Sequence, residues 1–439
     1  MEDRGEPNLY LPPEIMDDIL LWLPAKSLCR FKCVSKPWKA MISDTHFVKR
    51  HINRATENKD VFLQRRRVIF TDAADNGLYT LDLDEFLKNH KHVLLKNHAA
   101  DTDNGIDNDD DEEDEQVAAT KLDYIYREQP SVRVPFFHSC NGLILLELSD
   151  LELYLVNPAT SESKHLAKPP LDYYEFHNYN YHLYGFGFDS SSSQYQLVQG
   201  DICIHDDDIF LGWWGTWFSV YNFETDSWRH KLSSPHPYIP ASSQMHRNEN
   251  GVMLNGRFHW LMKSLKRYNY DDEAFVIVAL DAPLIRTREI PLPPELSSGS
   301  QLVKLGAFRE WLCITLATVE PHHAETYSEF WVMKEYGVRE SWTKMRVSIP
   351  YAELSHSGFW TESHDLMVFG ERLILYNFDE ENPQSFQNLS VREIGKVGRV
   401  GVYIESLVSV RDLIRDLNNM RINPWIDRRR GKYSYQSAG

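Results

Sequence analysis

Apolar residues recur at helical spacing in three short stretches of residues 11–42, and prolines separate these stretches. The first stretch begins at Pro12, where a helix loses nothing from a missing N–H, and it places Ile15 and Ile19 four residues apart. Pro24 cannot continue this helix, so the pattern restarts after it. A unit of about 40 residues or fewer rarely encloses a core alone. We therefore expect it to dock on a neighbouring domain or on a partner.

From about residue 61 onward, the pattern changes to short apolar or aromatic runs that turn residues interrupt. Asn141-Gly142 and Asn255-Gly256 each join two such runs, and Asn-Gly suits the twist of a hairpin. Inner and outer hairpins alternate, which gives four strands in each unit of about 40 to 60 residues. These features predict a mainly β fold, a kelch-like β-propeller of about six blades. The alternative is a β-sandwich, which needs fewer strands and no repeat.

Strands from both ends of this region are expected to close the ring. Residues 61–86 resemble an incomplete blade, and residues 400–410 form a lone strand pattern at the far end. A short helix is predicted at residues 410–419, with Leu413 and Leu417 on one face that would pack on the propeller.

One segment explains most of the negative charge. The chain of 439 residues has a net charge of −17, and ten acidic side chains lie in residues 101–115, which leaves −7 elsewhere. A block this dense repels itself, so we expect a disordered acidic insert at 101–116; the alternative is an attraction for a basic partner. An acidic balance without a basic face disfavours a nucleic-acid partner.

The five cysteines are scattered and form no C-x-x-C pair, which favours a reducing compartment. No apolar run approaches the roughly 20 residues that span a bilayer, so we expect no membrane partner. The expected location is the cytoplasm, and the basic run at residues 428–432 is a candidate nuclear address.

The string L-P-x-E-I-x-x-D-I-L-x-x-L-P-x-K-S-L-x-R-F-K-C-V-S-K-x-W at residues 11–38 resembles an F-box. The resemblance implies binding to a Skp1-type adaptor and, through it, to cullin-1 and a RING protein. A plain helical cap on the next domain is the alternative. By resemblance, eleven residues divide between the adaptor interface and the small helical core, and the sequence leaves open which do which. They are Leu11, Pro12, Ile15, Ile19, Leu20, Leu23, Pro24, Leu28, Phe31, Val34 and Trp38.

Motifs of the later region are similar to the plant F-box-associated domain, especially in S-locus F-box and S-locus-F-box-like proteins. They include N-G-L-I, N-P-A-T, G-F-G-F-D, L-N-G-x-F-H-W-L and the closing Y-I-E-S-L-V. This resemblance implies a substrate receptor of an SCF ubiquitin ligase, with a basic S-RNase as one expected substrate. The acidic insert and the segment beyond about residue 411 depart from the family pattern.

Residues 171–184 are rich in Tyr, His and Asn, a mixture typical of loops that bind protein surfaces. A loop that only covers blade edges is the alternative. The candidate substrate contacts are Tyr173, Tyr174, His177, Tyr179, Tyr181 and His182.

No hydrolase elbow, zinc-protease motif, phosphate loop or dinucleotide fingerprint occurs in the chain. We therefore expect no enzyme activity, no catalytic residue, no cofactor and no metal. Two alternatives remain: a propeller enzyme, and a glycan-binding receptor that uses Trp213, Trp214 and Trp217. The expected domains are an F-box at 1–50 (core 11–42), a propeller at 61–411 and a tail at 412–439.

Overall fold

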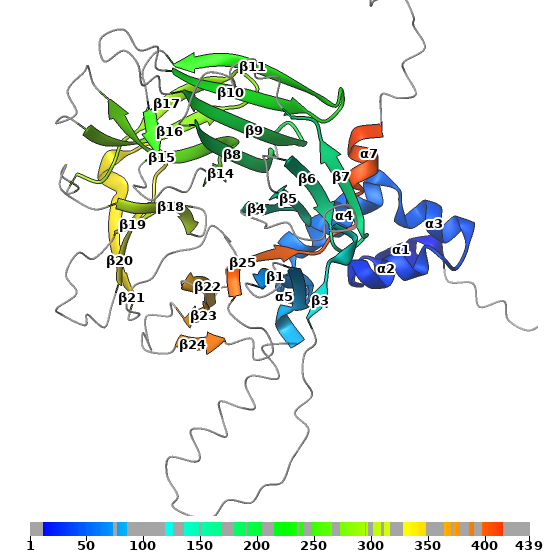
Figure 1. Cartoon of the computed structure of the whole chain (residues 1–439). Coiled ribbons are helices and arrows are strands. Elements are labelled where there is room, and N and C mark those ends of the chain that lie inside the picture. The colour runs from blue at the N-terminus through cyan, green and yellow to red at the C-terminus, as the bar shows by residue number, and fades with distance from the viewer. Residues whose placement is uncertain are drawn as a thin grey trace, which may run out of the picture.

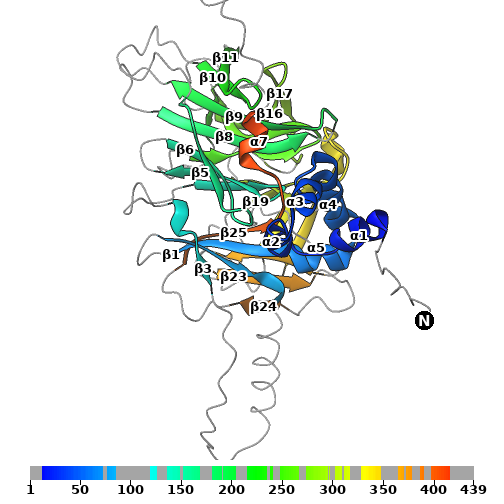
Figure 2. The same ribbon diagram turned by 90° about the vertical axis from the view of Figure 1, so that its right-hand side faces the viewer.

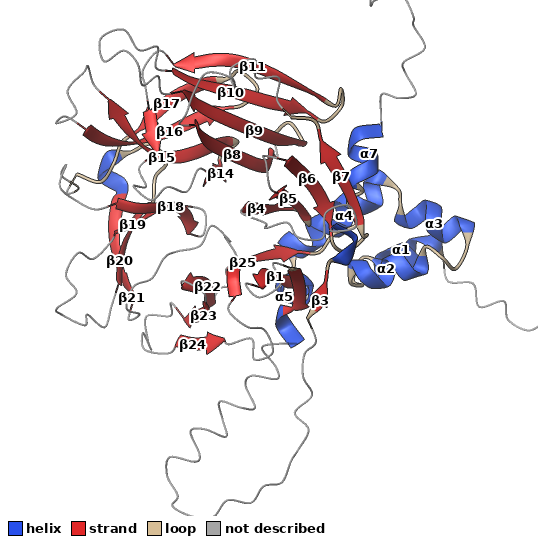
Figure 3. Cartoon of the chain, viewed as in Figure 1, coloured by secondary structure: helices blue, strands red, loops and turns tan. Residues whose placement is uncertain are grey.

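The computed structural model places a group of helices beside sheets that surround a common centre (Figures 1 and 3). It describes residues 12–72, 77–85, 119–125, 136–148, 152–168, 180–189, 191–203, 215–234, 238–240, 248–265, 273–294, 296, 302–308, 311–316, 328–347, 364–369, 372–377, 386–389 and 397–415. The acidic insert at 101–116 lies outside the described residues, as does the chain after residue 415.

Five helices open the described chain: α1 (Pro13–Leu20), α2 (Ala25–Phe31), α3 (Lys36–Ile42), α4 (Thr45–Glu57) and α5 (Lys59–Arg65). The first three correspond to the predicted stretches. Polar side chains begin the later helices: Ser35 accepts a hydrogen bond from the backbone N–H of Trp38, and Asp44 accepts one from that of Phe47. The incomplete blade expected from residue 61 begins instead at Arg66, because Asn58 caps α5 and makes residues 59–65 helical.

The strands among the described residues form six sheets, and the chain enters most of them at the first strand of a hairpin. The first sheet contains β1 (Arg66–Asp72), β2 (Leu78–Asp82), β3 (Thr120–Lys121) and β25 (Val397–Ile404). The second contains β4 (Phe136–Cys140), β5 (Leu143–Leu148), β6 (Glu152–Asn157) and β7 (Glu162–Leu166). The third contains β8 (Asn180–Asp189), β9 (Gln194–Cys203), β10 (Gly215–Asn222), β11 (Ser227–Ser234) and β13 (Asn248–Asn250).

The fourth sheet contains β12 (Tyr238–Pro240), β14 (Val252–Leu254), β15 (Arg257–Leu265), β16 (Glu273–Asp281) and β17 (Arg286–Ile290). The fifth contains β18 (Leu302–Phe308), β19 (Trp311–Leu316), β20 (Ser328–Met333) and β21 (Trp342–Val347). The sixth contains β22 (His364–Phe369), β23 (Arg372–Asn377) and β24 (Phe386–Leu389). The mainly β propeller is confirmed; five sheets have at least four strands, and the sixth has three among the described residues.

The chain closes the ring with strands from its two ends, as predicted. Strand β25 pairs antiparallel with β1, and Val402 lies opposite Val68. The predicted Asn-Gly hairpins are also present, and both residues of each turn have positive φ: 48° and 79° at Asn141 and Gly142, 50° and 69° at Asn255 and Gly256. Positive φ at both positions is the geometry that Asn-Gly favours.

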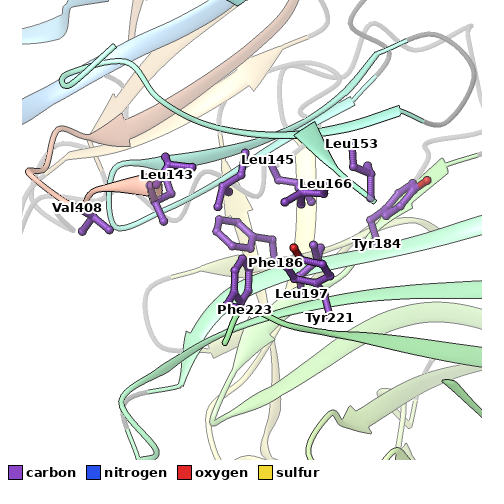
Figure 4. Packing of buried hydrophobic residues seen from close by; sticks show 12 residues of the cluster. Leu143, Leu145, Leu153, Leu166, Tyr184, Phe186, Leu197, Tyr221, Phe223 and Val408 are labelled. Atoms are coloured by element: carbon purple, nitrogen blue, oxygen red, sulfur yellow. The ribbon is translucent and has the colours of Figure 1, made fainter. Parts of the chain in front are cut away.

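Neighbouring sheets pack through apolar faces. Between the second and third sheets, Leu145 and Leu153 face Phe186 and Tyr221 in one buried cluster (Figure 4). Two outer tryptophans join neighbouring sheets through their indole N–H groups. Trp228 donates to the carbonyl of Ala167 at 2.5 Å, and Trp342 donates to that of Pro291 at 2.8 Å. The expected tail helix is present as α7 (Val410–Arg415), and its Leu413 packs against the same buried cluster.

Candidate functional site

The apolar residues of the first three helices divide into a buried set and an exposed set. Leu20 and Leu28 are 2% and 0% exposed, and they pack with Ile42 and Phe47. Leu407, which follows β25, completes this cluster. The helical core therefore rests partly on the propeller and does not stand alone.

A stripe of exposed apolar side chains runs along the other side of α1 and into the turn after it. Ile15, Ile19 and Trp22 are 48%, 49% and 44% exposed. Ile15 and Ile19, four residues apart, lie on one face of α1, and Trp22 follows in the turn after the helix. We call these three residues the apolar stripe. Val34, in the turn between α2 and α3, is 64% exposed and adds a further apolar contact point.

The remaining predicted adaptor residues fall between these two sets. Leu23, Phe31 and Trp38 are partly buried against the helical core, and the Phe31 and Trp38 rings meet edge to face at 5.5 Å. Pro24 is half-buried and Pro12 is exposed, while Leu11 lies outside the described residues. Trp22 was not among the predicted residues, although its spacing of seven from Ile15 continues the same apolar pattern in the sequence.

Arg65 ties three parts of the helical unit together from a fully buried position. Its guanidinium donates hydrogen bonds to the backbone carbonyls of His51 and Leu21 at 2.6 Å each, and to that of Leu23 at 3.1 Å. Leu21 and Leu23 follow α1, where carbonyls lack an intrahelical partner and a cation can satisfy them, whereas His51 lies within α4. Burial, followed by the charge of Arg65, lowers the pKa of His51 to about 3.

Residues 405–410, here called the junction segment, join the helices to the sheets (Figure 2). Glu405 accepts a hydrogen bond from the backbone N–H of Ala25, the first residue of α2, at 2.7 Å. Its second carboxylate oxygen lies 3.0 Å from Arg67 of β1. Asn157, at the end of β6, donates to the carbonyls of Ser406 and Val408 at 3.1 and 2.7 Å. One short segment therefore contacts α2, β1 and β6.

The residues expected to contact a substrate are only partly described. Tyr173, Tyr174, His177 and Tyr179 lie outside the described residues. Tyr181 and His182 belong to β8, so the expected loop ends before them. His182 is 3% exposed, and its Nδ1 lies 2.8 Å from a carboxylate oxygen of Asp201. This buried pairing removes His182 from the set of direct contacts.

The residues named for the glycan-binding alternative are also divided. Trp213 and Trp214 lie outside the described residues, and Trp217 is a half-buried residue of β10.

Burial raises the pKa of the Cys313 thiol to about 12, which makes it unreactive at neutral pH. Within the described ranges, no three His, Cys, Asp or Glu side chains gather as metal ligands would. The helices of the described chain are too short or too polar to cross a bilayer.

Comparison with known proteins matches both regions. The F-box domain matches residues 9–50, and the F-box associated beta propeller domain matches residues 90–410. An F-box/kelch-repeat protein of Arabidopsis thaliana is 25% identical over 92% of this chain and 96% of its own length. The F-box protein CPR1 of Arabidopsis thaliana is 25% identical over 76% of this chain and 72% of its own.

Among solved structures, the tricorn protease aligns with a TM-score of 0.37 and 9% identity, over 79% of this chain and 30% of that chain, a similarity too distant to support an inference. The family assignment instead follows from the two domain matches and from the fold. This chain belongs to the F-box proteins that carry an F-box associated β-propeller domain.

Proposed function

We propose that this protein is a substrate receptor of an SCF-type ubiquitin ligase. Its helices bind a Skp1-type adaptor, which connects the chain to cullin-1 and a RING protein. Its propeller binds the protein to be ubiquitinated. The observation that carries the proposal is the apolar stripe of Ile15, Ile19 and Trp22, which is exposed on α1 and the turn after it, while the other side of α1 is already buried.

The distribution of exposed apolar side chains supports an interface at the helices. Six large apolar residues are exposed in the described part of the chain, and four of them lie between residues 15 and 34. The other two, Leu284 and Val338, are in separate turns of the propeller. Apolar side chains that gather on one exposed surface mark a protein contact more often than isolated ones do.

The direction of the strands places the start of β8 away from the end of β4, where the junction segment lies. Strands β4 and β8 run in the same direction, since the His138 ring lies against that of Phe186 and the Cys140 thiol hydrogen-bonds to the backbone of Phe188. The end of β4 lies beside the junction segment, because Ser406 donates a hydrogen bond to the carbonyl of Asn141. The chain enters β8 at the opposite end of these strands. We propose that the substrate contacts lie in the sequence just before and at this entry. They are Tyr173, Tyr174, His177, Tyr179 and Tyr181.

Such a receptor acts by proximity and needs no catalytic residue of its own. Holding a target near a charged E2 raises its effective concentration there, and the geometry decides which lysines are reached. We therefore propose a non-catalytic role, without cofactor or metal, in the cytoplasm or nucleus. The motifs shared with S-locus F-box proteins favour a basic S-RNase as substrate, and the acidic residues 101–115 suit a basic target.

Binding to a purified Skp1-type adaptor tests the adaptor half of this proposal. Ile15→Asp places a charge in the apolar stripe and should abolish binding. Leu284→Asp is the matched control, because Leu284 is 57% exposed in a propeller turn and should tolerate the same change. Failure of the unmodified chain to bind any Skp1-type adaptor would refute the proposal, as would unchanged binding by Ile15→Asp.

A further inference from the structure

The junction segment holds the helices and the propeller through separate bonds from adjacent residues. Glu405 is 4% exposed, and each of its carboxylate oxygens has a different partner. One oxygen accepts from the backbone N–H of Ala25, and the other pairs with Arg67 of β1. Arg67 also lies 3.0 Å from a carboxylate oxygen of Asp82 in β2. A single side chain thus connects the start of α2 to two strands of the closing sheet.

The position of Glu405 on α2 has an electrostatic consequence. The first backbone N–H groups of a helix have no carbonyl partner and carry partial positive charge. A carboxylate there is both a hydrogen-bond acceptor and a favourable charge. Pro24 precedes α2 and makes no side-chain hydrogen bond to it, so the capping group comes from Glu405, 380 residues away.

The backbone beside Glu405 fixes the remaining helices. The Glu405 N–H donates to the carbonyl of Arg65 at 3.0 Å. The Arg65 side chain in turn binds carbonyls that follow α1 and belong to α4. Leu407, 1% exposed, fills the helical core from the propeller side. Rotation of the helical unit against the sheets would break the bond from Ala25 to Glu405 and withdraw Leu407 from the helical core.

We propose that Glu405 is a positioning residue that fixes the direction in which the apolar stripe faces relative to the propeller. The proposal concerns geometry, and only its consequence for ubiquitination rests on the proposed function. A receptor with a fixed angle between adaptor and substrate presents a restricted set of lysines to the E2. A receptor with a loose junction presents a wider set.

The test measures the distance between the two parts of the full chain. Genetically encoded ketone residues replace Lys39 of α3 and Glu224 of the β10–β11 turn, which are both exposed. A label is attached to each ketone, and the distance between the two labels is measured. The unmodified chain should give one narrow distance distribution. Glu405→Ala should broaden it, whereas Glu405→Gln, which keeps an oxygen for the Ala25 N–H, should restore most of the narrow distribution.

A matched control shows whether a broader distribution results from the loss of Glu405 in particular or from the loss of any carboxylate. Glu152 lies in β6, pairs with Lys168 at 2.8 Å and has no described contact with the helices, so Glu152→Ala should leave the distance unchanged. A narrow distribution in Glu405→Ala would overturn the proposal. If that variant does not fold, hydrogen exchange of the Ala25 amide in the unmodified chain decides. Slow exchange supports the bond to Glu405, and exchange as fast as at a free helix end refutes it.

The reconstituted ligase adds a second readout. Glu405→Ala should bind the adaptor as tightly as the unmodified chain, because the apolar stripe is intact, but the set of lysines modified on the receptor itself should widen. An unchanged set would overturn the positioning role. Failure of the unmodified chain to bind the adaptor would refute the proposed function alone, since the distance measurement needs no adaptor.

Discussion

Ile19 and Leu20 are neighbours in α1 with opposite environments, and alanine at each position should have opposite effects. Ile19 is 49% exposed and Leu20 is 2% exposed. Complete burial of an isoleucine side chain contributes about 1.5–3 kcal/mol, so the exposed half of Ile19 leaves about 1 kcal/mol for a partner. Ile19→Ala should therefore weaken adaptor binding roughly fivefold. Its effect on folding should stay within about 0.5 kcal/mol, as for most surface substitutions.

Leu20→Ala should show the reverse pattern. Removing a buried leucine side chain costs about 2–5 kcal/mol of folding free energy, a large share of the stability of a typical domain. Urea unfolding measures the stability of both variants, and titration calorimetry with a Skp1-type adaptor measures binding at a temperature where both are folded. Equal loss of stability in the two variants would show that the assignment of interface and core in α1 is wrong.

Three further predictions concern the helical unit, the propeller and the junction segment. Burial lowers the pKa of two fully buried histidines from 6.5 in the unfolded chain to about 3 for His51 and about 4 for His259. The unfolded chain therefore binds protons that the folded chain does not. Stability should be complete above pH 6.5 and fall as the pH drops towards 4. Urea unfolding at pH 7 and pH 5 measures this difference. A chain that is more stable at pH 5 than at pH 7 would contradict the reasoning. Trp342→Phe leaves the carbonyl of Pro291 without its indole donor and should lower the free energy of unfolding by about 1–3 kcal/mol. Thermal unfolding measures this, and an unchanged melting temperature would show that the bond does not stabilise the chain. Gly142→Ala should destabilise the chain more than Gly337→Ala. Both glycines have positive φ, but a Cβ at Gly142 would lie 2.4 Å from Ser406 Oγ, and at Gly337 it would meet nothing within 4 Å. Equal melting temperatures would contradict this close approach.

Local signals predicted much of the fold. Prolines and polar caps separate the first three helices, and Asn-Gly pairs mark two hairpins, because both features act within a few residues. The repeat of hairpins then predicted blades, and the two unmatched strand patterns predicted closure. The helix α4 was missed, although Asp44 followed by Phe47, Val48 and Ile52 carries a cap and an apolar face.

The candidate site was harder to predict because it depends on contacts between distant residues. Both sides of α1 are apolar, so spacing alone could not assign Ile19 to the surface and Leu20 to the core. Arg65 and Glu405 appear in the sequence as ordinary charged residues. Only the fold brings each to the helical unit, where they cap backbone groups from a buried position.

Closure of the ring by the first and last strands has a consequence during synthesis on the ribosome. Ala25 is translated 380 residues before Glu405, and β1 leaves the ribosome long before β25 is made. Until then, the nascent helices lack Leu407 beneath their core, and β1 presents an unpaired edge that invites aggregation. A message truncated before residue 397 would therefore yield a chain that can complete neither the helical core nor the ring, because both need residues 397–407.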